Sequence, residues 1–125
     1  MIARVTTRTR TAMIVEKRRI GDHTILAVEG VIKLGESAQF LAETLERLLE
    51  EAAGHVLLDL ERINYIDSTG IGELVGYLGR FGERQRRLVL VHPSERIRRL
   101  LQVAQLDDLF PTYDDLEEAT AAECR

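Results

Sequence analysis

The sequence has little cysteine and no long apolar run. Its one cysteine, Cys124, is the penultimate of 125 residues, so no internal disulfide is possible and a reducing compartment is expected. No apolar stretch approaches the roughly 18 residues that a membrane-spanning helix needs. The N-terminal stretch "MIARVTTRTRTAM" lacks the apolar centre of a secretory signal. We therefore expect a soluble, cytoplasmic protein without membrane insertion.

The sequence motifs of common catalytic and cofactor sites are also missing. It contains no G-x-S-x-G elbow, no phosphate-binding G-x-x-x-x-G-K-[ST] loop and no H-E-x-x-H pair. The run Gly70-Ile71-Gly72 does not continue to G-x-G-x-x-G, because residue 75 is Val. The three histidines stand near predicted strand ends without a recognisable catalytic triad. The sequence therefore predicts a protein that is not an enzyme and has no cofactor or metal, and a hydrolase using Ser68 beside Asp67 is the rival class.

Charge is unevenly distributed along the chain. The net charge is -4, yet residues 1–19 hold six Arg or Lys and a single acid, Glu16. Such a segment is typical of either a nucleic-acid-binding arm or a solvated, frayed terminus. We favour the second, because no aromatics are interleaved with the arginines and an acidic body repels phosphate. Residues 1–12 are thus predicted to be a basic, partly disordered arm, residues 13–125 the folded domain, and direct nucleic-acid binding is not expected.

Hydrophobic periodicity predicts strands alternating with helices. Two β-prone runs, "MIVEKRRI" and "TILAVEGVI", flank a Gly21-Asp22 turn signal that is typical of a hairpin. A helix is predicted from Glu36 to Gly54, followed by a buried strand over 55–60. Further along, we expect an amphipathic helix after residue 66, the strand "RLVLV", a helix capped by Ser94 and a last helix in "DDLEEATAAE". This order is typical of one α/β domain with helices packed on a sheet.

The stretch "INYIDSTGIGELVGYL" places Asp67, Ser68 and Thr69 at the joint between a predicted strand and a predicted helix. Asp, Ser and Thr are preferred caps for the unpaired N–H groups of a helix start, and capping needs one such residue. The same N–H groups and the positive end of the helix dipole also favour an anion. A phosphate on one of the hydroxyls would therefore lie in a favourable field, opposed only by the adjacent acid.

Three glycines, Gly72, Gly76 and Gly79, fall inside the predicted helix, where each costs roughly 1 kcal/mol relative to alanine. At spacings of four and three they form a smooth stripe that permits close approach of another backbone. The neighbour is either a helix of the same domain or a partner protein. Their place beside the hydroxyl residues favours a docking surface. In the same helix, Ile71, Leu74, Val75 and Leu78 are predicted to face the core, with Glu73, Arg80 and Arg84 opposite.

The stretch "LLDLERINYIDSTGIGELVGYLGRF", together with "VEGVI" before it and "LVLVHPSERIRRLLQVAQLDDLF" after it, resembles the STAS domain of bacterial anti-sigma-factor antagonists. The resemblance covers Met13 to Ala122, and the run D-S-T-G-I-G is its specific core. It implies a small mixed sheet with helices against one face. It also implies that the first hydroxyl after the aspartate, Ser68, is phosphorylated, and that Thr69 is only its neighbour.

The resemblance further implies the partners and the role. The kinase would be an anti-sigma factor of the histidine-kinase-like ATPase fold, and a serine phosphatase would reset the protein. The unphosphorylated protein would bind this kinase and release the sigma factor. The predicted partner-binding residues come from the joint and the helix after it: Asp67, Ser68, Thr69, Gly70, Ile71, Gly72, Glu73 and Gly76.

One residue departs from the family pattern: Lys33, in "GVIKLGES", stands where an acidic group is common. Other STAS domains serve in stress-signalling assemblies, lipid-transport complexes or anion transporters. The alternative role is therefore that of a subunit in a larger assembly.

Overall fold

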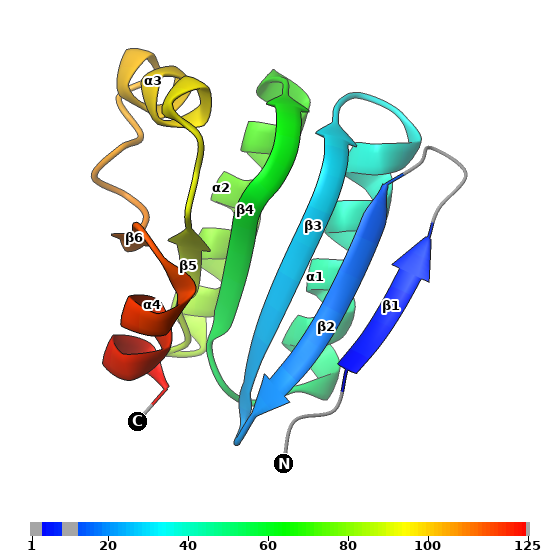
Figure 1. The fold of residues 1–125 in the computed structure, drawn as a ribbon, viewed down its shortest axis with the longest axis vertical. Coiled ribbons are helices and arrows are strands. Elements are labelled where there is room, and N and C mark those ends of the chain that lie inside the picture. The colour runs from blue at the N-terminus through cyan, green and yellow to red at the C-terminus, as the bar shows by residue number, and fades with distance from the viewer. Residues whose placement is uncertain (1–3, 9–12, 125) are drawn as a thin grey trace.

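The computed structural model describes residues 4–8 and 13–124. These residues form a six-stranded sheet whose spatial order is the order of the strands in the chain (Figure 1). The elements are β1 (Arg4–Arg8), β2 (Ile14–Ile20), β3 (His23–Ile32), α1 (Glu36–Glu51), β4 (Val56–Ile66), α2 (Ser68–Glu83), β5 (Leu88–Val91), α3 (Glu95–Val103), β6 (Thr112–Tyr113) and α4 (Leu116–Glu123).

The first half of the sheet is antiparallel. Strands β2 and β3 form the predicted hairpin, and their turn contains Gly21 with φ +60°, a backbone conformation that glycine adopts without a steric penalty. Strand β1 adds to the outer edge of β2, from Arg4 opposite Arg18 to Arg8 opposite Ile14. Residues 4–8, which we expected to fray with the rest of the N-terminal arm, are thus paired in the sheet. The remainder of the predicted arm lies outside the described residues.

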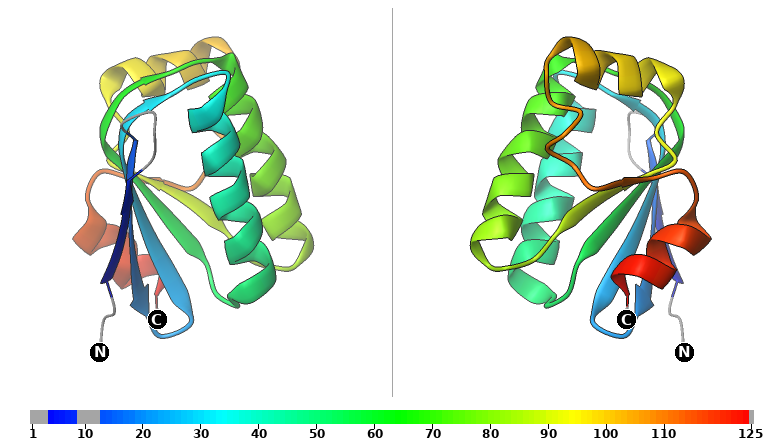
Figure 2. Two further views of the ribbon diagram at one scale, coloured as in Figure 1. Left: turned by 90° about the vertical axis from the view of Figure 1, so that its right-hand side faces the viewer. Right: turned by 90° about the vertical axis from the view of Figure 1, so that its left-hand side faces the viewer.

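The second half of the sheet is parallel, and its connections decide where the helices lie. Strands β3, β4, β5 and β6 run in one direction, with α1 crossing from β3 to β4 and α2 from β4 to β5. Crossovers between parallel strands are nearly always right-handed, so two consecutive crossovers that advance in the same direction place their helices on the same face. Figure 2 shows α1 and α2 side by side on one face of the sheet, and α4 on the other.

The core has two layers, one on each face of the sheet. The larger layer lies between the sheet and helices α1 and α2, and it contains Leu41, Leu45, Leu58 and Phe81. The smaller layer lies under α4 and consists of Ile25, Leu57, Val89, Val91 and Ala119. Burial on both faces explains why residues 56–60 of β4 and the whole of β5 are nearly continuous apolar runs in the sequence.

Strand β4 is longer than predicted. The sequence predicted its end at residue 60, because polar residues follow, but the ladder with β3 continues to the pair Ile32 and Ile66. Two register irregularities interrupt this ladder, one of them between Gly30 and Val31. In the extension only Ile63 and Ile66 are buried, so apolar periodicity does not mark it as a strand. The extension brings the end of β4 beside the end of β3, where the candidate site lies.

The C-terminal elements differ from the predictions in two details. Helix α3 begins at the predicted cap, Ser94, whose Oγ accepts the Ile97 N–H at 3.2 Å. It lies across one end of the sheet and buries Ile97 and Leu101, so the prediction that Leu100 and Ala104 also point inward is wrong. The two-residue strand β6 was not predicted, because it is too short to show periodicity.

Candidate functional site

Asp67 follows the last residue of β4 and caps helix α2. Its Oδ1 accepts the Gly70 N–H at 3.0 Å, and its Oδ2 accepts the N–H of Leu34 at 2.9 Å, from the loop between β3 and α1. The Asp67 backbone N–H donates to the Ile32 carbonyl at 3.1 Å. One carboxylate therefore joins the end of β3, the end of β4 and the start of α2.

These bonds decide the charge of Asp67. The backbone N–H of Leu34, and then that of Gly70, lower the pKa of the carboxyl group below its ordinary value by hydrogen bonding to the ionised form. Asp67 is thus an anion at neutral pH, and it satisfies an N–H of the first helical turn that a bound anion would otherwise contact.

Ser68 is the first residue of α2 and is exposed, whereas Thr69 is half-buried. The first turn of α2 holds no acidic side chain, so the positive end of the helix dipole is opposed only by the cap residue, Asp67. Beside it lies the loop held by Asp67, in which Leu34 is 75% exposed and Lys33 is exposed. The Ser68 hydroxyl is therefore accessible to another macromolecule.

Gly70 is the one predicted partner-binding residue that the structure buries. A Cβ atom at this position would stand 2.7 Å from Ile66 Cγ1 and 2.8 Å from Ile32 Cγ2, well inside normal contact distances. Gly70 therefore permits the first turn of α2 to pack on the ends of β3 and β4. Its part is to position the site, and a direct contact between this residue and a partner is not consistent with its burial.

The other glycines of α2 face open space. A Cβ atom at Gly72, Gly76 or Gly79 would meet nothing within 4 Å, and all three residues are exposed. The alternative that this stripe serves close packing inside the domain is therefore wrong. The stripe continues the exposed surface of Ser68 along the length of the helix, and Ile71 and Glu73 beside it are half-buried.

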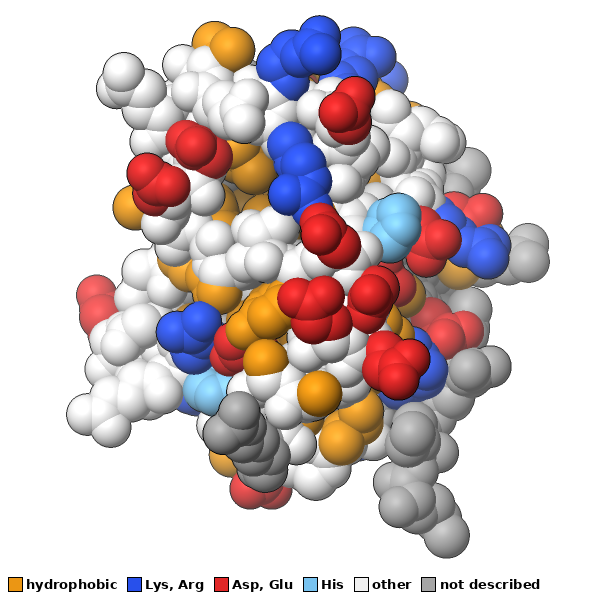
Figure 3. Space-filling model, turned by 60° about the vertical axis from the view of Figure 1, so that its left-hand side comes forward, with side chains coloured by type: hydrophobic (Ala, Val, Ile, Leu, Met, Phe, Trp, Pro, Cys, Tyr) orange, Lys and Arg blue, Asp and Glu red, His pale blue; other side chains and the backbone are white. Residues whose placement is uncertain are grey.

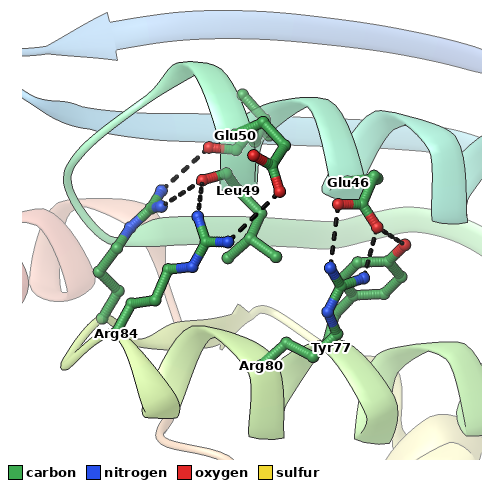
Figure 4. A network of polar contacts seen from close by, with 8 residues as sticks. Glu46, Leu49, Glu50, Tyr77, Arg80 and Arg84 are labelled. Carbon is green, nitrogen blue, oxygen red and sulfur yellow. Dashed lines mark hydrogen bonds and ion pairs between the residues drawn. The ribbon is translucent and has the colours of Figure 1, made fainter.

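The flank of α2 that faces α1 carries a polar network (Figure 4). The two terminal nitrogens of Arg80, Nη1 and Nη2, both donate to the Glu46 carboxylate, Nη2 at 3.0 Å, and the Tyr77 hydroxyl donates to Glu46 at 3.1 Å. Arg80 also lies over the Tyr77 ring, 5.1 Å from its centre. This network fixes α2 against α1.

Arg84 extends the network by one turn. Its Nη1 donates to the Leu49 carbonyl at 2.8 Å, and its Nη2 lies 3.3 Å from a Glu50 oxygen (Figure 4). Arg80 and Arg84 are exposed and lie opposite the core-facing residues of α2, as predicted, and both side chains also contact α1. The exposed face beside them carries the glycines.

Two contacts near the site were not found in the sequence. The family resemblance implies that the segment of Lys33 lies near the phosphorylation site, but the bond from the Leu34 N–H to Asp67, which depends on the parallel pairing of β3 with β4, was not predicted. At the same end of the sheet, Arg96 of α3 lies 5.4 Å over the ring of Tyr65. Figure 3 shows Lys and Arg side chains gathered over this end of the molecule. No short-range sequence signal connects these segments.

Among the described residues, no hydrogen bond joins Ser68 to a histidine, as the rival hydrolase would need. His23 and His55 stack on each other at the opposite end of the parallel strands from Ser68, and His92 is an exposed loop residue. Within residues 4–8 and 13–124, no three His, Cys, Asp or Glu side chains are grouped so that they could hold a metal ion. In the same part of the chain, none of the helices combines the length and the apolar character needed to span a bilayer.

Comparison with known proteins agrees with this fold. The sequence matches the STAS domain family over residues 14–119. An anti-sigma-B factor antagonist of Listeria monocytogenes is 37% identical over 95 residues, which are 75% of this chain and 82% of the relative. The chain belongs to the STAS domain family.

Solved structures show the same architecture. An anti-sigma factor antagonist from Mycobacterium paratuberculosis aligns with a TM-score of 0.78 at 18% identity, over 95% of this chain and 100% of that one. The anti-sigma factor antagonist SpoIIAA, in its unphosphorylated form, aligns with a TM-score of 0.64 at 16% identity, over 96% and 94% of the two chains. At these identities the likeness concerns the fold.

Proposed function

We propose that this protein is an anti-sigma factor antagonist, a binding module of the cytoplasm whose affinity for an anti-sigma kinase is set by phosphorylation of Ser68. The observation that carries the proposal is the exposed Ser68 hydroxyl at the start of α2, directly after an aspartate whose carboxylate is fully engaged by backbone N–H groups. The names of the curated relatives support the same role.

The docking surface would consist of the Ser68 joint and the outward face of α2. Exposed glycines at positions 72 and 76 allow another protein to approach the helix backbone closely, and they cost helix stability without any packing gain inside the domain. Leu34, 75% exposed beside the joint, adds an apolar contact. A surface that is smooth, partly apolar and free of long side chains at its centre is suited to protein binding.

The switch would act through charge. A phosphate on Ser68 adds about -1.5 to -2 charge at neutral pH, in the centre of the proposed surface and next to the Asp67 carboxylate. The helix dipole of α2 stabilises this phosphate in the free protein. The same charge opposes desolvation on docking, so the phosphorylated form would bind the kinase weakly and leave the sigma factor captured. SpoIIAA, a structural neighbour, has been solved in both unphosphorylated and phosphorylated forms.

In this scheme the protein supplies an acceptor hydroxyl and a surface, and its partners supply the chemistry. The kinase, an anti-sigma factor of the histidine-kinase-like ATPase fold, would bring ATP, and a serine phosphatase would remove the phosphate. The direct test is to mix the purified protein with a candidate kinase of its source, with and without ATP, and to measure complex formation. Binding that ATP abolishes in step with labelling supports the proposal. Binding that is permanent and indifferent to ATP would instead indicate a structural subunit of a larger assembly.

A further inference from the structure

His23 and His55 form a stacked pair at the end of the parallel strands that lies away from Ser68. Their ring centres are 5.0 Å apart, and the ring planes are inclined by 24°. His23 begins β3, and His55 directly precedes β4, so the two rings stand at the amino-terminal ends of neighbouring strands. They are separate from the site described above, which is at the carboxyl-terminal ends of the same strands.

Each ring of the pair accepts a backbone hydrogen bond through the same nitrogen. The His55 N–H donates to Nδ1 of His23 at 2.9 Å, and the Arg87 N–H donates to Nδ1 of His55 at 3.0 Å. A neutral imidazole has one N–H and one acceptor nitrogen, so both rings carry their proton on Nε2. Any further proton must enter at Nδ1, where a backbone N–H already points.

The two acceptor bonds connect segments that are distant in the sequence. His23 belongs to the hairpin of β2 and β3, His55 to the connection between α1 and β4, and Arg87 to the connection between α2 and β5. Backbone bonds reinforce the junction, from Thr24 N–H to the His55 carbonyl at 3.0 Å and from Val56 N–H to the Arg87 carbonyl at 3.0 Å.

Arg87 extends the junction to the C-terminal helix. Its Nε donates to Glu123 Oε1 of α4 at 2.8 Å, and the Tyr113 hydroxyl of β6 donates to Glu123 Oε2 at 2.5 Å. The backbone of Arg87 is thus hydrogen-bonded to His55, and the Arg87 side chain is bonded to Glu123 of α4. Release of the backbone bond would loosen the anchor of the helix that covers the second face of the sheet.

We propose that His23 and His55 form an acid-sensitive latch, in which protonation of His55 breaks its hydrogen bond with the Arg87 N–H and loosens the α2–β5 connection and α4. In the imidazolium, Nδ1 of His55 carries a hydrogen that points at the Arg87 N–H, so two donors face each other and the Arg87 N–H loses its acceptor. The loosening affects only this end of the sheet and does not depend on Ser68.

Some of the charged and titratable groups around His55 lower its pKa and others raise it. Burial of the ring lowers the pKa of His55 most, and His23, Arg87 and Arg86 lower it further, whereas Glu123 of α4 opposes them. Cys124, also on the C-terminal segment, lines the same hollow of about 510 Å³ beside the two histidines. An unfolded histidine titrates near pH 6.5. Because the folded form has the lower pKa, the stabilising contribution of neutral His55 is complete above about pH 6.5 and is lost progressively as the pH falls below it.

The experiment follows amide hydrogen exchange and the histidine resonances by NMR between pH 7.5 and 5.5, a range above the titration of ordinary carboxylates. We expect the protection factor of the Arg87 amide to fall at least tenfold, with a midpoint equal to that of His55 itself, while amides of central β4 such as Leu58 keep theirs. Nitrogen shifts should identify the Nε2–H form of both neutral rings.

Two variants separate the latch from general acid sensitivity. Asparagine can place its Oδ1 near the position of Nδ1 and does not titrate, so His55→Asn should remove the pH dependence of the Arg87 amide. His92→Asn is the matched control, because His92 is exposed and has φ +53°, a conformation that asparagine tolerates, and it should behave as the wild type. Unchanged protection of Arg87 at pH 5.5 in the wild type, an Nδ1–H tautomer for His55, or an equal loss in His55→Asn would each overturn the proposal.

Discussion

The carboxylate of Asp67 accepts the backbone N–H of Leu34, a residue 33 positions earlier in the chain, at 2.9 Å. Through this bond the cap of α2 also holds the loop that precedes α1, so that Leu34 and Ser68 belong to one surface. The geometry of the proposed docking site thus depends on a side chain that does not itself have to touch the partner.

Removal of this carboxylate should destabilise the fold more than removal of an ordinary cap. Asp67→Ala loses the bonds to Gly70 and Leu34, whereas Asp115→Ala, the control, loses one bond to the Glu118 N–H at start of α4. We expect a larger drop in thermal midpoint for Asp67→Ala at pH 7. Equal drops would show that the Leu34 bond contributes nothing to stability.

The same comparison has a defined pH dependence. Because hydrogen bonds lower the pKa of Asp67 in the folded protein, its contribution is complete above the unfolded value near 3.9 and is lost as the pH falls through the lower folded value. The difference in thermal midpoint between the wild type and Asp67→Ala should therefore be constant from pH 7 to about 5 and shrink below pH 4. Melting curves over this range provide the measurement.

Ser68 should be the residue that accepts the phosphoryl group. Incubation with the cognate kinase and ATP, followed by mass-spectrometric mapping, should place the phosphate on Ser68, and Ser68→Ala should not be labelled. Thr69→Ala serves as the control and should be labelled normally, since Thr69 is half-buried. A phosphate found only on Thr69 would show that Thr69, and not Ser68, is the acceptor.

Charge at position 68 should control affinity. Ser68→Asp and Ser68→Glu introduce a negative group into the proposed surface, so both should bind the kinase more weakly than Ser68→Ala in a titration. Glu83→Gln at the far end of α2 tests whether any change of charge on this helix has the same effect, and it should leave the affinity unchanged. Equal affinities for the three Ser68 variants would mean that charge at this position is not the switch.

A side chain at position 76 should leave the fold intact but weaken binding to the kinase. Because a Cβ atom there meets nothing within 4 Å, Gly76→Ala should raise stability by up to about 1 kcal/mol, and Gly76→Leu should leave the thermal midpoint nearly unchanged. Binding of Gly76→Leu to the kinase should weaken at least tenfold, about 1.4 kcal/mol.

Gly70→Ala is the matched control for Gly76→Ala. Its Cβ atom would stand 2.7 Å from Ile66 Cγ1, so the same substitution should destabilise the protein by about 1 to 3 kcal/mol through overpacking. Normal kinase binding by Gly76→Leu would restrict the docking surface to the joint from Asp67 to Gly72 and to Glu73.

Arg86 should be a principal stabilising residue of the helical layer. It is 8% exposed, and its guanidinium donates to the carbonyls of Leu48, Leu49 and Gly54 at the end of α1. Arg86→Ala removes all three bonds of this buried cation; the Leu48 and Leu49 carbonyls keep the Ala52 N–H and Arg84 as donors, whereas the Gly54 carbonyl loses its side-chain donor. The substitution should cost about 3 kcal/mol in a denaturant titration. Arg84→Ala, which removes an exposed arginine from the same Leu49 carbonyl, should cost less than half as much. Similar losses would mean that burial of Arg86 adds nothing.

Local patterns in the sequence predicted most of the elements. The hairpin around Gly21, the helix that begins at Glu36 and the helix cap at Ser94 are confirmed, and of the three candidate caps from Asp67 to Thr69 the structure uses Asp67. These features depend on residues close together in the chain, since turns, caps and amphipathic faces are set by neighbours within one or two helical turns. The α/β architecture and the STAS family membership followed from the same stretches and are confirmed.

The errors fall where burial depends on distant elements. Leu100 was expected in the core, but α3 lies across one end of the sheet and buries only a narrow stripe, so the residue is 39% exposed. Arg80 is exposed opposite the core-facing side of α2, as predicted, but its contact with Glu46 of the neighbouring helix α1 was not predicted. The periodicity of a helix shows which residues share a face, and it does not show which neighbouring element the face meets.

The sequence by itself determined that an aspartate and a serine stand at the start of a helix, because capping chemistry and the change from strand to helix periodicity are local. It also determined that the helix carries glycines, at a cost to its own stability. Only the tertiary structure decided that Gly70 packs inside while Gly72, Gly76 and Gly79 face open space, and that Leu34 lies beside Ser68. The physical reason is that parallel strands bring their carboxyl ends together across long crossovers, so contacts between those ends join residues that no local pattern relates.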